Sequence, residues 1–162
     1  MGLSVSVFKN IKETKNIENY DFKAYVIDND WKYKIKNLNE GSYYKGERTE
    51  SEVNYSYGTH NRFREHLLKI LDRYDLLLDD GRINWFILEK ESKLPFFELI
   101  NFADNEGCLD YEISKTLYFN FIEHKEKALK YFGKDNYFTN IYLAWIDVFK
   151  DGKETNNVVV FS

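Results

Sequence analysis

The chain opens with alternating apolar and polar positions, which is the period of a half-buried strand. Residues 3–8, 22–27 and 31–36 all show this alternation, so each range predicts a strand. Residues 40–58 are rich in Gly, Tyr, Ser and charged side chains and lack an apolar period. We interpret that stretch as an ordered loop or an irregular pair of strands.

From Thr59 onward the apolar positions recur every three or four residues, which predicts helices. The first helix begins with Thr59 as its N-cap. A long helix follows from Asp110 to Phe132, with Phe121 in the middle of its apolar stripe, and Gly133 ends it. A third helix runs from Asp135 to Gly152.

Three shorter apolar runs complete the pattern. Residues 95–102 predict a buried strand that ends in the turn 103–107, and residues 157–161 predict a closing strand. Residues 83–88 fit a strand or a helix equally well. Segregated helices and strands favour an α+β fold: a mainly antiparallel sheet with three helices packed on it, in a single domain over residues 1–162.

Composition and charge narrow the class of protein. The 162 residues are 43% apolar, which excludes general disorder, and no run of about 18 apolar residues exists to span a membrane. A net charge of −4, with no stripe of Lys and Arg, disfavours a nucleic-acid polymer as partner. We expect a cytoplasmic protein, because the N-terminus lacks the pattern of an export signal and Cys108 is the sole cysteine.

Several common kinds of site are missing from the sequence. It has no glycine-rich phosphate loop, no His-Glu-x-x-His and no Gly-x-Ser-x-Gly elbow. The three histidines have no metal-ligand spacing, so we expect neither a metal nor a cofactor. Cys108 follows Gly107 near a predicted helix start, where a thiolate is stabilised, but a small buried apolar side chain is the favoured interpretation.

The first candidate site lies in residues 56–64, around the predicted helix start. A Gly-Thr pair and two arginines fall here, and residues 53–64 contain no acidic side chain. Free N–H groups at a helix N-terminus attract anions, and the arginine fork matches phosphate or carboxylate. We therefore expect ligand contacts from Tyr57, Thr59, His60, Asn61, Arg62 and Arg64. The alternative is a set of ordinary capping and surface residues, with Arg64 paired to a carboxylate.

The second candidate site is the turn 101–107, which contains Asp104 and Glu106. Carboxylates at the end of a strand can hold ribose hydroxyls, a cation or a basic group of a partner. Simple turn chemistry explains the same residues, because Asp and Asn favour turns and Gly107 supplies a positive φ. Two carboxylates without a third group give little support to acid–base catalysis.

The two segments together resemble a widespread family of small uncharacterised bacterial and phage proteins. The first family motif is matched by Ser56, Tyr57, His60, Asn61, Phe63 and Arg64. The second, Pro-Phe-x-Glu-Leu-Ile-Asn-Phe-Ser-Asp-x-Glu-Gly, is matched over residues 95–107 except that its serine is Ala103 here. The resemblance implies a shared fold and a setting in conflict between phage and host, such as counter-defence. It implies no activity, and Ala103 removes any role for that hydroxyl.

Three hypotheses for the function follow. The favoured one is a non-enzymatic binding protein for a small anionic, nucleotide-like ligand, with Arg62 and Arg64 on phosphate, tyrosines on a base, and Asp104 and Glu106 on hydroxyls or amines. The alternative is an inhibitor or immunity-type protein that binds a protein partner through an acidic, tyrosine-rich surface. A hydrolase built on His60, Asp104 and Glu106 ranks last, because it lacks a nucleophile.

Overall fold

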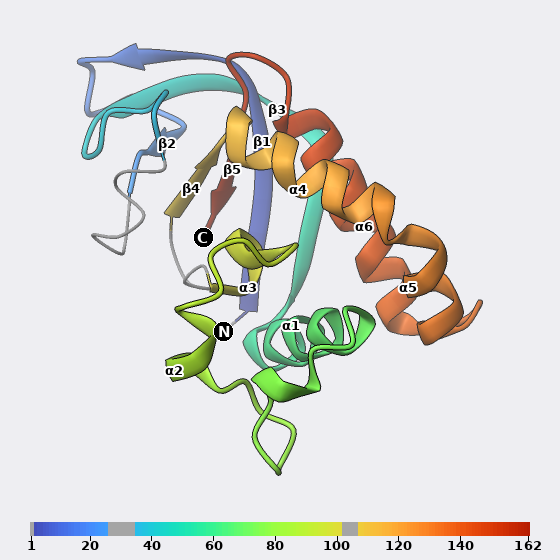
Figure 1. Ribbon diagram of the computed structural model, residues 1–162. Helices are drawn as coiled ribbons and strands as arrows, with labels where there is room; N and C mark the ends of the chain where they lie inside the picture. Colours follow the sequence, from blue (N-terminus) through green and yellow to red (C-terminus); the bar gives the residue numbers. More distant parts are fainter. Residues whose placement is uncertain (1, 26–34, 102–106) are drawn as a thin grey trace.

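The computed structural model describes residues 2–25, 35–101 and 107–162 and shows one antiparallel sheet of five strands (Figure 1). The strand order is β2-β3-β1-β5-β4, and every pair of neighbours is antiparallel. The strands are β1 (Gly2–Thr14), β2 (Phe22–Lys23), β3 (Tyr43–Ser56), β4 (Gly107–Asp110) and β5 (Val158–Phe161). The predicted α+β class and the antiparallel sheet are confirmed.

Six helices and one 3-10 turn accompany the sheet in the described ranges, where the sequence pattern had predicted three helices. They are α1 (Tyr57–Ile70), η1 (Tyr74–Leu76), α2 (Trp85–Leu88), α3 (Phe97–Asn101), α4 (Tyr111–Glu123), α5 (Lys125–Phe132) and α6 (Tyr137–Gly152). Helices α4 and α6 lie together over one face of the sheet, and α1 lies beyond the end of β3 (Figure 1).

The core lies between that sheet face and the helices. The apolar residues of β1, Leu3, Val5 and Val7, are buried, as their alternation predicts. Phe121 of α4 is fully buried, which confirms its predicted place, and its ring lies 4.7 Å from that of Tyr142. The opposite side of β1 carries Ser4, Ser6 and Phe8.

The prediction for residues 40–58 is wrong, because most of this stretch forms the single strand β3. It pairs with β1 from Tyr43 to Ser56, with two shifts in register. Only Tyr44, Val53 and Tyr55 among its residues are buried. An outer strand that covers so little apolar surface leaves no alternation in the sequence.

The prediction of a strand at residues 95–102 is also wrong, because Phe97–Asn101 form helix α3. Its side chains at Phe97, Leu99 and Ile100 are all buried. A short apolar run is compatible with a buried strand and with a buried helical turn, since neither leaves a polar face. The sheet instead contains β4 (Gly107–Asp110), which the sequence had placed in a turn and a helix start.

The long helix predicted from Asp110 to Phe132 is divided at His124. Asp110, where the predicted helix begins, is the N-cap of α4, and its carboxylate accepts from the N–H of Ile113 at 3.0 Å. At His124 the backbone leaves helical geometry, with φ −96° and ψ 6°. Its ring Nδ1 lies 2.9 Å from the carbonyl of Asn120, where it competes with the backbone for that acceptor.

The remaining predictions differ in their bounds. Residues 83–88 contain the short helix α2, which Asn84 caps through the N–H of Ile87. Helix α6 begins at Tyr137 with Asn136 as its cap, two residues later than predicted. Half of the residues in the predicted strands at 22–27 and 31–36 fall in residues 26–34, outside the described residues, and Phe22–Lys23 form the short strand β2.

Candidate functional site

The N-cap of helix α1 is Ser56 and not Thr59, three residues earlier than predicted. The Ser56 hydroxyl accepts from the N–H of Thr59 at 3.1 Å and lies 3.0 Å from the Thr59 hydroxyl. The cap occupies one of the donors that an anion would use. Around it, Tyr57 and Thr59 are half-buried, whereas Asn61 and Arg62 are exposed.

His60 points into the core and joins a buried network. The indole N–H of Trp145 donates to the Tyr55 hydroxyl at 2.8 Å, and that hydroxyl lies 2.9 Å from His60 Nδ1. The Tyr55 oxygen thus contacts two buried ring nitrogens, while Nε2 of His60 has no hydrogen-bond partner among the described residues. Burial, reinforced by the charge of Arg64, lowers the pKa of His60 to about 3, so the ring stays neutral at physiological pH.

Arg64 also lies inside, 5% exposed, between α1 and α3. Its Nη1 donates to the carbonyl of Ile100 at 3.2 Å, and its guanidinium also bonds to Asn61. The guanidinium carbon lies 5.1 Å from the centre of the Trp85 ring. Arg64 thus contacts Ile100, which comes just before the turn 101–107, but most of that turn lies outside the described residues.

The predicted site residues consequently divide into three groups. His60 and Arg64 have buried partners and contribute to the packing of α1. Tyr57, Thr59, Asn61 and Arg62 surround the start of α1, where anion binding stays a prediction. Asp104 and Glu106 lie outside the described residues.

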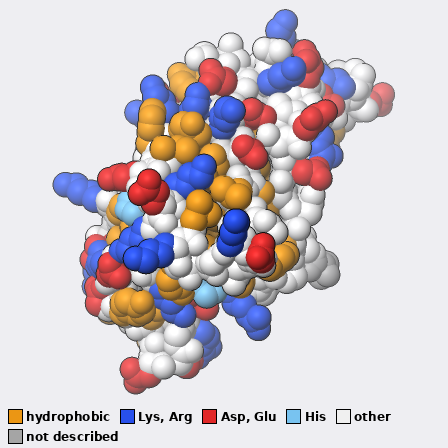
Figure 2. Space-filling model, turned by 90° about the vertical axis from the view of Figure 1, so that its right-hand side faces the viewer, with side chains coloured by type: hydrophobic (Ala, Val, Ile, Leu, Met, Phe, Trp, Pro, Cys, Tyr) orange, Lys and Arg blue, Asp and Glu red, His pale blue; other side chains and the backbone are white. Residues whose placement is uncertain are grey.

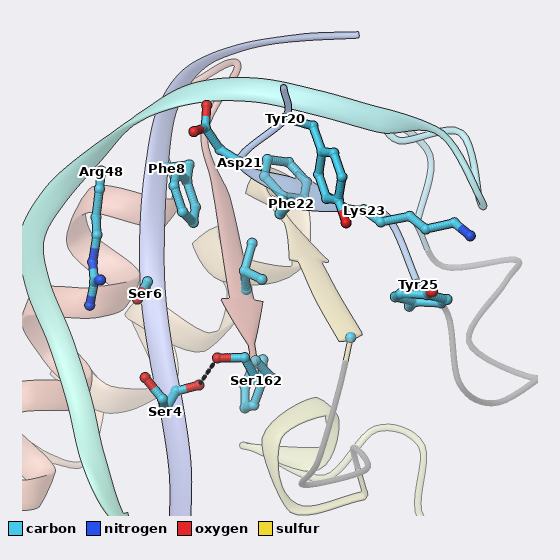
Figure 3. Close-up of a pocket in the computed structure, with 13 residues that line it drawn as sticks. Ser4, Ser6, Phe8, Tyr20, Asp21, Phe22, Lys23, Tyr25, Arg48 and Ser162 are labelled. Atoms are coloured by element: carbon cyan, nitrogen blue, oxygen red, sulfur yellow. Dashed lines mark hydrogen bonds between the residues drawn. The ribbon is translucent and has the colours of Figure 1, made fainter. Parts of the chain in front are cut away.

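A hollow that the sequence did not suggest lies on the sheet face that carries Ser4, Ser6 and Phe8. We call it the sheet-face pocket; it has a volume of about 350 Å³ and is shown in Figure 3. Its floor is formed by β1 and β5, and the segment 20–25 forms its wall. Figure 3 shows Phe8, Phe22 and Tyr20 together at one end and the hydroxyls of Ser4 and Ser162 at the other.

Several aromatic rings line the sheet-face pocket. The Phe8 and Phe22 rings lie 5.4 Å apart, and Phe22 stacks on Tyr44 at 5.3 Å. Tyr20 and Tyr25 are each 44% exposed, so their rings are open to a ligand. Flat apolar rings beside hydroxyl groups are typical of a small-molecule site.

Three charged side chains line the same pocket. Asp21 accepts from the N–H of Gly46 at 2.9 Å and lies 3.5 Å from the Lys45 ammonium. Arg48 forms an ion pair with Glu52 at 2.8 Å. These pairs leave Asp21 and Arg48 with little uncompensated charge.

Lys23 differs from the other two, because no carboxylate lies within ion-pair distance of it in the described ranges. Its ammonium lies 5.0 Å from the Tyr25 ring and 5.2 Å from the Tyr43 ring. Interaction with Tyr25, followed by Tyr43, raises the pKa of Lys23, so it is charged at neutral pH. Lys23 is therefore an uncompensated cation in the lining of the sheet-face pocket, beside the exposed ring of Tyr25 and the half-buried ring of Tyr43.

The residues of the sheet-face pocket carry one signal that sequence reasoning could have used. Ser4, Ser6 and Phe8 occupy the polar side of the first alternation, and Phe8 is a large ring at a position that water would otherwise cover. The wall that residues 20–25 add to this pocket depends on the path of the chain back over the sheet, and local sequence patterns do not predict that path.

Metal and thiol chemistry find no support in the described part of the chain. It contains no group of three or more His, Cys, Asp or Glu side chains placed to hold a metal ion. Cys108 is buried in β4, and burial raises the pKa of its thiol to about 12. The favoured interpretation of Cys108 as a small buried side chain is confirmed.

Comparison of the chain with protein-family models, with curated proteins and with solved structures finds no match. The resemblance to the phage and bacterial family therefore stays a prediction. Within the described ranges, no helix has the length and apolar character needed to cross a bilayer.

Proposed function

We propose that the chain is a non-enzymatic binding protein that captures a small ligand with an aromatic ring and an anionic group, such as a nucleotide. The proposal keeps the ligand class expected from the sequence and assigns the sheet-face pocket as its site. The observation that carries it is the uncompensated Lys23 ammonium beside the exposed ring of Tyr25, with the exposed Tyr20 in the same pocket lining.

Each part of such a ligand has a counterpart in the sheet-face pocket. The ring of the ligand stacks on Tyr20 or Tyr25, a contact worth about 1–3 kcal/mol for a base on an aromatic side chain. The anionic group pairs with Lys23. Ser4 and Ser6 offer hydroxyls to sugar or phosphate oxygens at the far end.

Binding, and not hydrolysis, fits the chemistry of the lining residues. The pocket lining includes neither a histidine nor a cysteine in the described ranges, and its carboxylate, Asp21, is held by Gly46 and Lys45. His60, the base of the hydrolase hypothesis, is buried and already hydrogen-bonded to Tyr55. A neutral ring with so low a pKa is a poor general base.

A second function, binding of a protein partner as an inhibitor or immunity-type protein, is supported by the helical surface. Figure 2 shows apolar side chains gathered in a band on this side of the molecule, with Lys and Arg between them. Phe119 and Ile122 of α4 are 54% and 41% exposed. Exposed apolar bands of this kind mark protein interfaces. We propose a cytoplasmic setting, in conflict between phage and host, for either function.

Calorimetric titration with a panel of cyclic and linear nucleotides tests the proposal. We expect at least one nucleotide to bind, and Lys23→Gln to weaken that binding about ten- to hundredfold, the loss of one charge-assisted contact. The exposed Lys130→Gln on α5 is the matched control and should leave the affinity unchanged. Binding that is lost in Arg62→Gln and kept in Lys23→Gln would move the site to the start of α1. No binding of any nucleotide would contradict the proposal.

A further inference from the structure

Strand β3 forms an outer edge of the sheet over its second half. β2 pairs with it only at Tyr43 and Tyr44, and the N–H of Gly46 is taken by the Asp21 carboxylate. Beyond that point β3 is bordered by β1 on one side alone among the described strands. Its far side is a strand edge, where backbone donors and acceptors can pair with another chain.

The register of the sheet shows which backbone groups face outward. Ser4 of β1 exchanges both backbone hydrogen bonds with Ser162, so its N–H and C=O point toward β5. Its register partner Asn54 therefore directs its own N–H and C=O away from β1. The same holds two residues earlier for Glu52, the partner of Ser6. Both residues are exposed, and neither has a backbone partner on its outer side in the described ranges.

A hollow of about 370 Å³ runs beside this edge, between β3 and α6. Its charged lining consists of four carboxylates and one ammonium group, from Glu50, Glu52, Asp147, Asp151 and Lys150. Glu50 and Asp147 are exposed and have no ion-pair partner in the described part of the chain. Asp151 accepts from the Ser51 hydroxyl at 2.7 Å, which holds α6 against the strand.

We propose that the β3 edge, from Glu52 to Ser56, binds an extended basic segment of a partner protein as an added strand. Backbone hydrogen bonds to Glu52 and Asn54 would fix the strand, as in other cases of strand addition. Its alternate side chains would face α6, where Lys or Arg would meet Asp147 and Asp151.

Charge decides which occupant fits this edge. An antiparallel second copy of the same edge would bring the unpaired Glu50 carboxylate close to the acidic stretch of the other chain, and like charges on paired strands repel. An apolar strand would remove water from Glu50 and Asp147 without compensating their charges. A basic segment does compensate the charges of Glu50 and Asp147, so a basic strand is the partner that fits this edge.

The test uses the full ¹⁵N-labelled chain and two blocked peptides of about six residues, one alternating Lys and Val and the other alternating Glu and Val. With the Lys peptide, we expect the amide signals of Glu52 and Asn54 to shift and their hydrogen exchange to slow. The Glu peptide should leave both unchanged. Exchange measured in the unaltered chain reports on the edge without any substitution.

Two substitutions at Asn54 separate backbone pairing from simple charge attraction. Asn54→Pro removes the outward N–H, which has no partner inside the molecule, and should weaken binding of the Lys peptide at least tenfold. Asn54→Ala keeps that N–H and should bind like the unaltered chain. Asp147→Asn should weaken binding about two- to fivefold at low salt, as expected for an exposed pair. Equal binding by Asn54→Pro and Asn54→Ala, or no slowing of exchange at Glu52 and Asn54, would overturn the inference.

Discussion

The indole N–H of Trp145 donates a hydrogen bond of 2.8 Å to the hydroxyl of Tyr55, across 90 positions of sequence. The bond joins α6 to β3 inside the core, where Trp145 is fully buried. The same hydroxyl satisfies His60 Nδ1, so one oxygen serves two buried ring nitrogens. Stability of the fold is therefore sensitive to that oxygen.

Removal of the Tyr55 hydroxyl oxygen should lower the free energy of unfolding more than the loss of a single atom would suggest. Tyr55→Phe leaves the Trp145 N–H and His60 Nδ1 without partners, and each unsatisfied buried group costs about 1–3 kcal/mol. We expect a drop of that order or more in the free energy of unfolding in urea. Tyr57→Phe is the matched control, since the half-buried Tyr57 lies at the surface start of α1, and it should change stability by less than about 0.5 kcal/mol. Equal effects of the two substitutions would contradict the role of the network.

The protonation of His60 should make stability fall in weak acid. Its pKa is about 3 in the folded chain and 6.5 when unfolded, so between these values the unfolded chain takes up a proton that the folded chain does not. The contribution of neutral His60 to the free energy of unfolding is fully present above pH 6.5. It declines as the pH falls and is smaller by about 2 kcal/mol at pH 5. Urea denaturation at pH 7 and pH 5 measures it. In His60→Gln the decline should be shallower by that amount; an unchanged slope would show that the ring titrates normally.

Phe121 should be among the most sensitive positions of the core. Its ring lies 4.9 Å from Phe96 and 5.7 Å from Phe149, with no surface exposed. Phe121→Ala should lower the free energy of unfolding by about 3–5 kcal/mol, because a cavity replaces the ring. Phe119→Ala, two residues away on the exposed side of the same helix, should lower it by less than about 1 kcal/mol. A loss below about 1 kcal/mol at Phe121 would show that the cavity collapses.

Gly152 marks a close approach of α6 to its neighbours. A Cβ added there would lie 2.6 Å from Cγ2 of Val159 and 3.0 Å from Oγ of Ser114. Gly152→Ala should therefore destabilise the fold by about 1–3 kcal/mol through overpacking. Gly58→Ala, in the first turn of α1, meets nothing closer than 3.8 Å and should be neutral or slightly stabilising. Thermal unfolding of the two variants measures the difference. A melting temperature of Gly152→Ala no lower than that of Gly58→Ala would show that the helix moves to make room for the Cβ.

The predictable parts of the fold are those in which one local pattern has one structural outcome. The alternation at residues 3–8 corresponds to β1 because one side of that strand is covered by helices and the other is not. The helix start near Asp110 was predictable from the helical spacing of the apolar residues that follow it, and the Asp110 carboxylate caps that start by accepting from the N–H of Ile113. Phe121 follows from helical spacing alone.

The rest depended on contacts between distant segments. β3 is a strand because it pairs with β1, and its own side chains carry no period that says so. Phe97–Asn101 are helical although their apolar run fits a buried strand as well. At the start of α1, composition predicted an anion site, but His60 and Arg64 meet partners 85 and 36 positions away, at Trp145 and Ile100. Rules based on the spacing of residues within one helix or strand cannot predict contacts at such sequence separations.

The pairing of β1 with β5 has a consequence for how the molecule forms. Ser4 and Ser162, which exchange backbone hydrogen bonds, are 158 positions apart, so this pairing closes a very long loop. Such non-local pairing slows folding, and during synthesis the sheet cannot be completed until β5 has left the ribosome. Among the described strands β4 pairs with β5 alone, so a chain interrupted before Val158 would leave β1 and β4 without this shared partner. Nascent chains of this protein should therefore depend on chaperones until β5 has been synthesised.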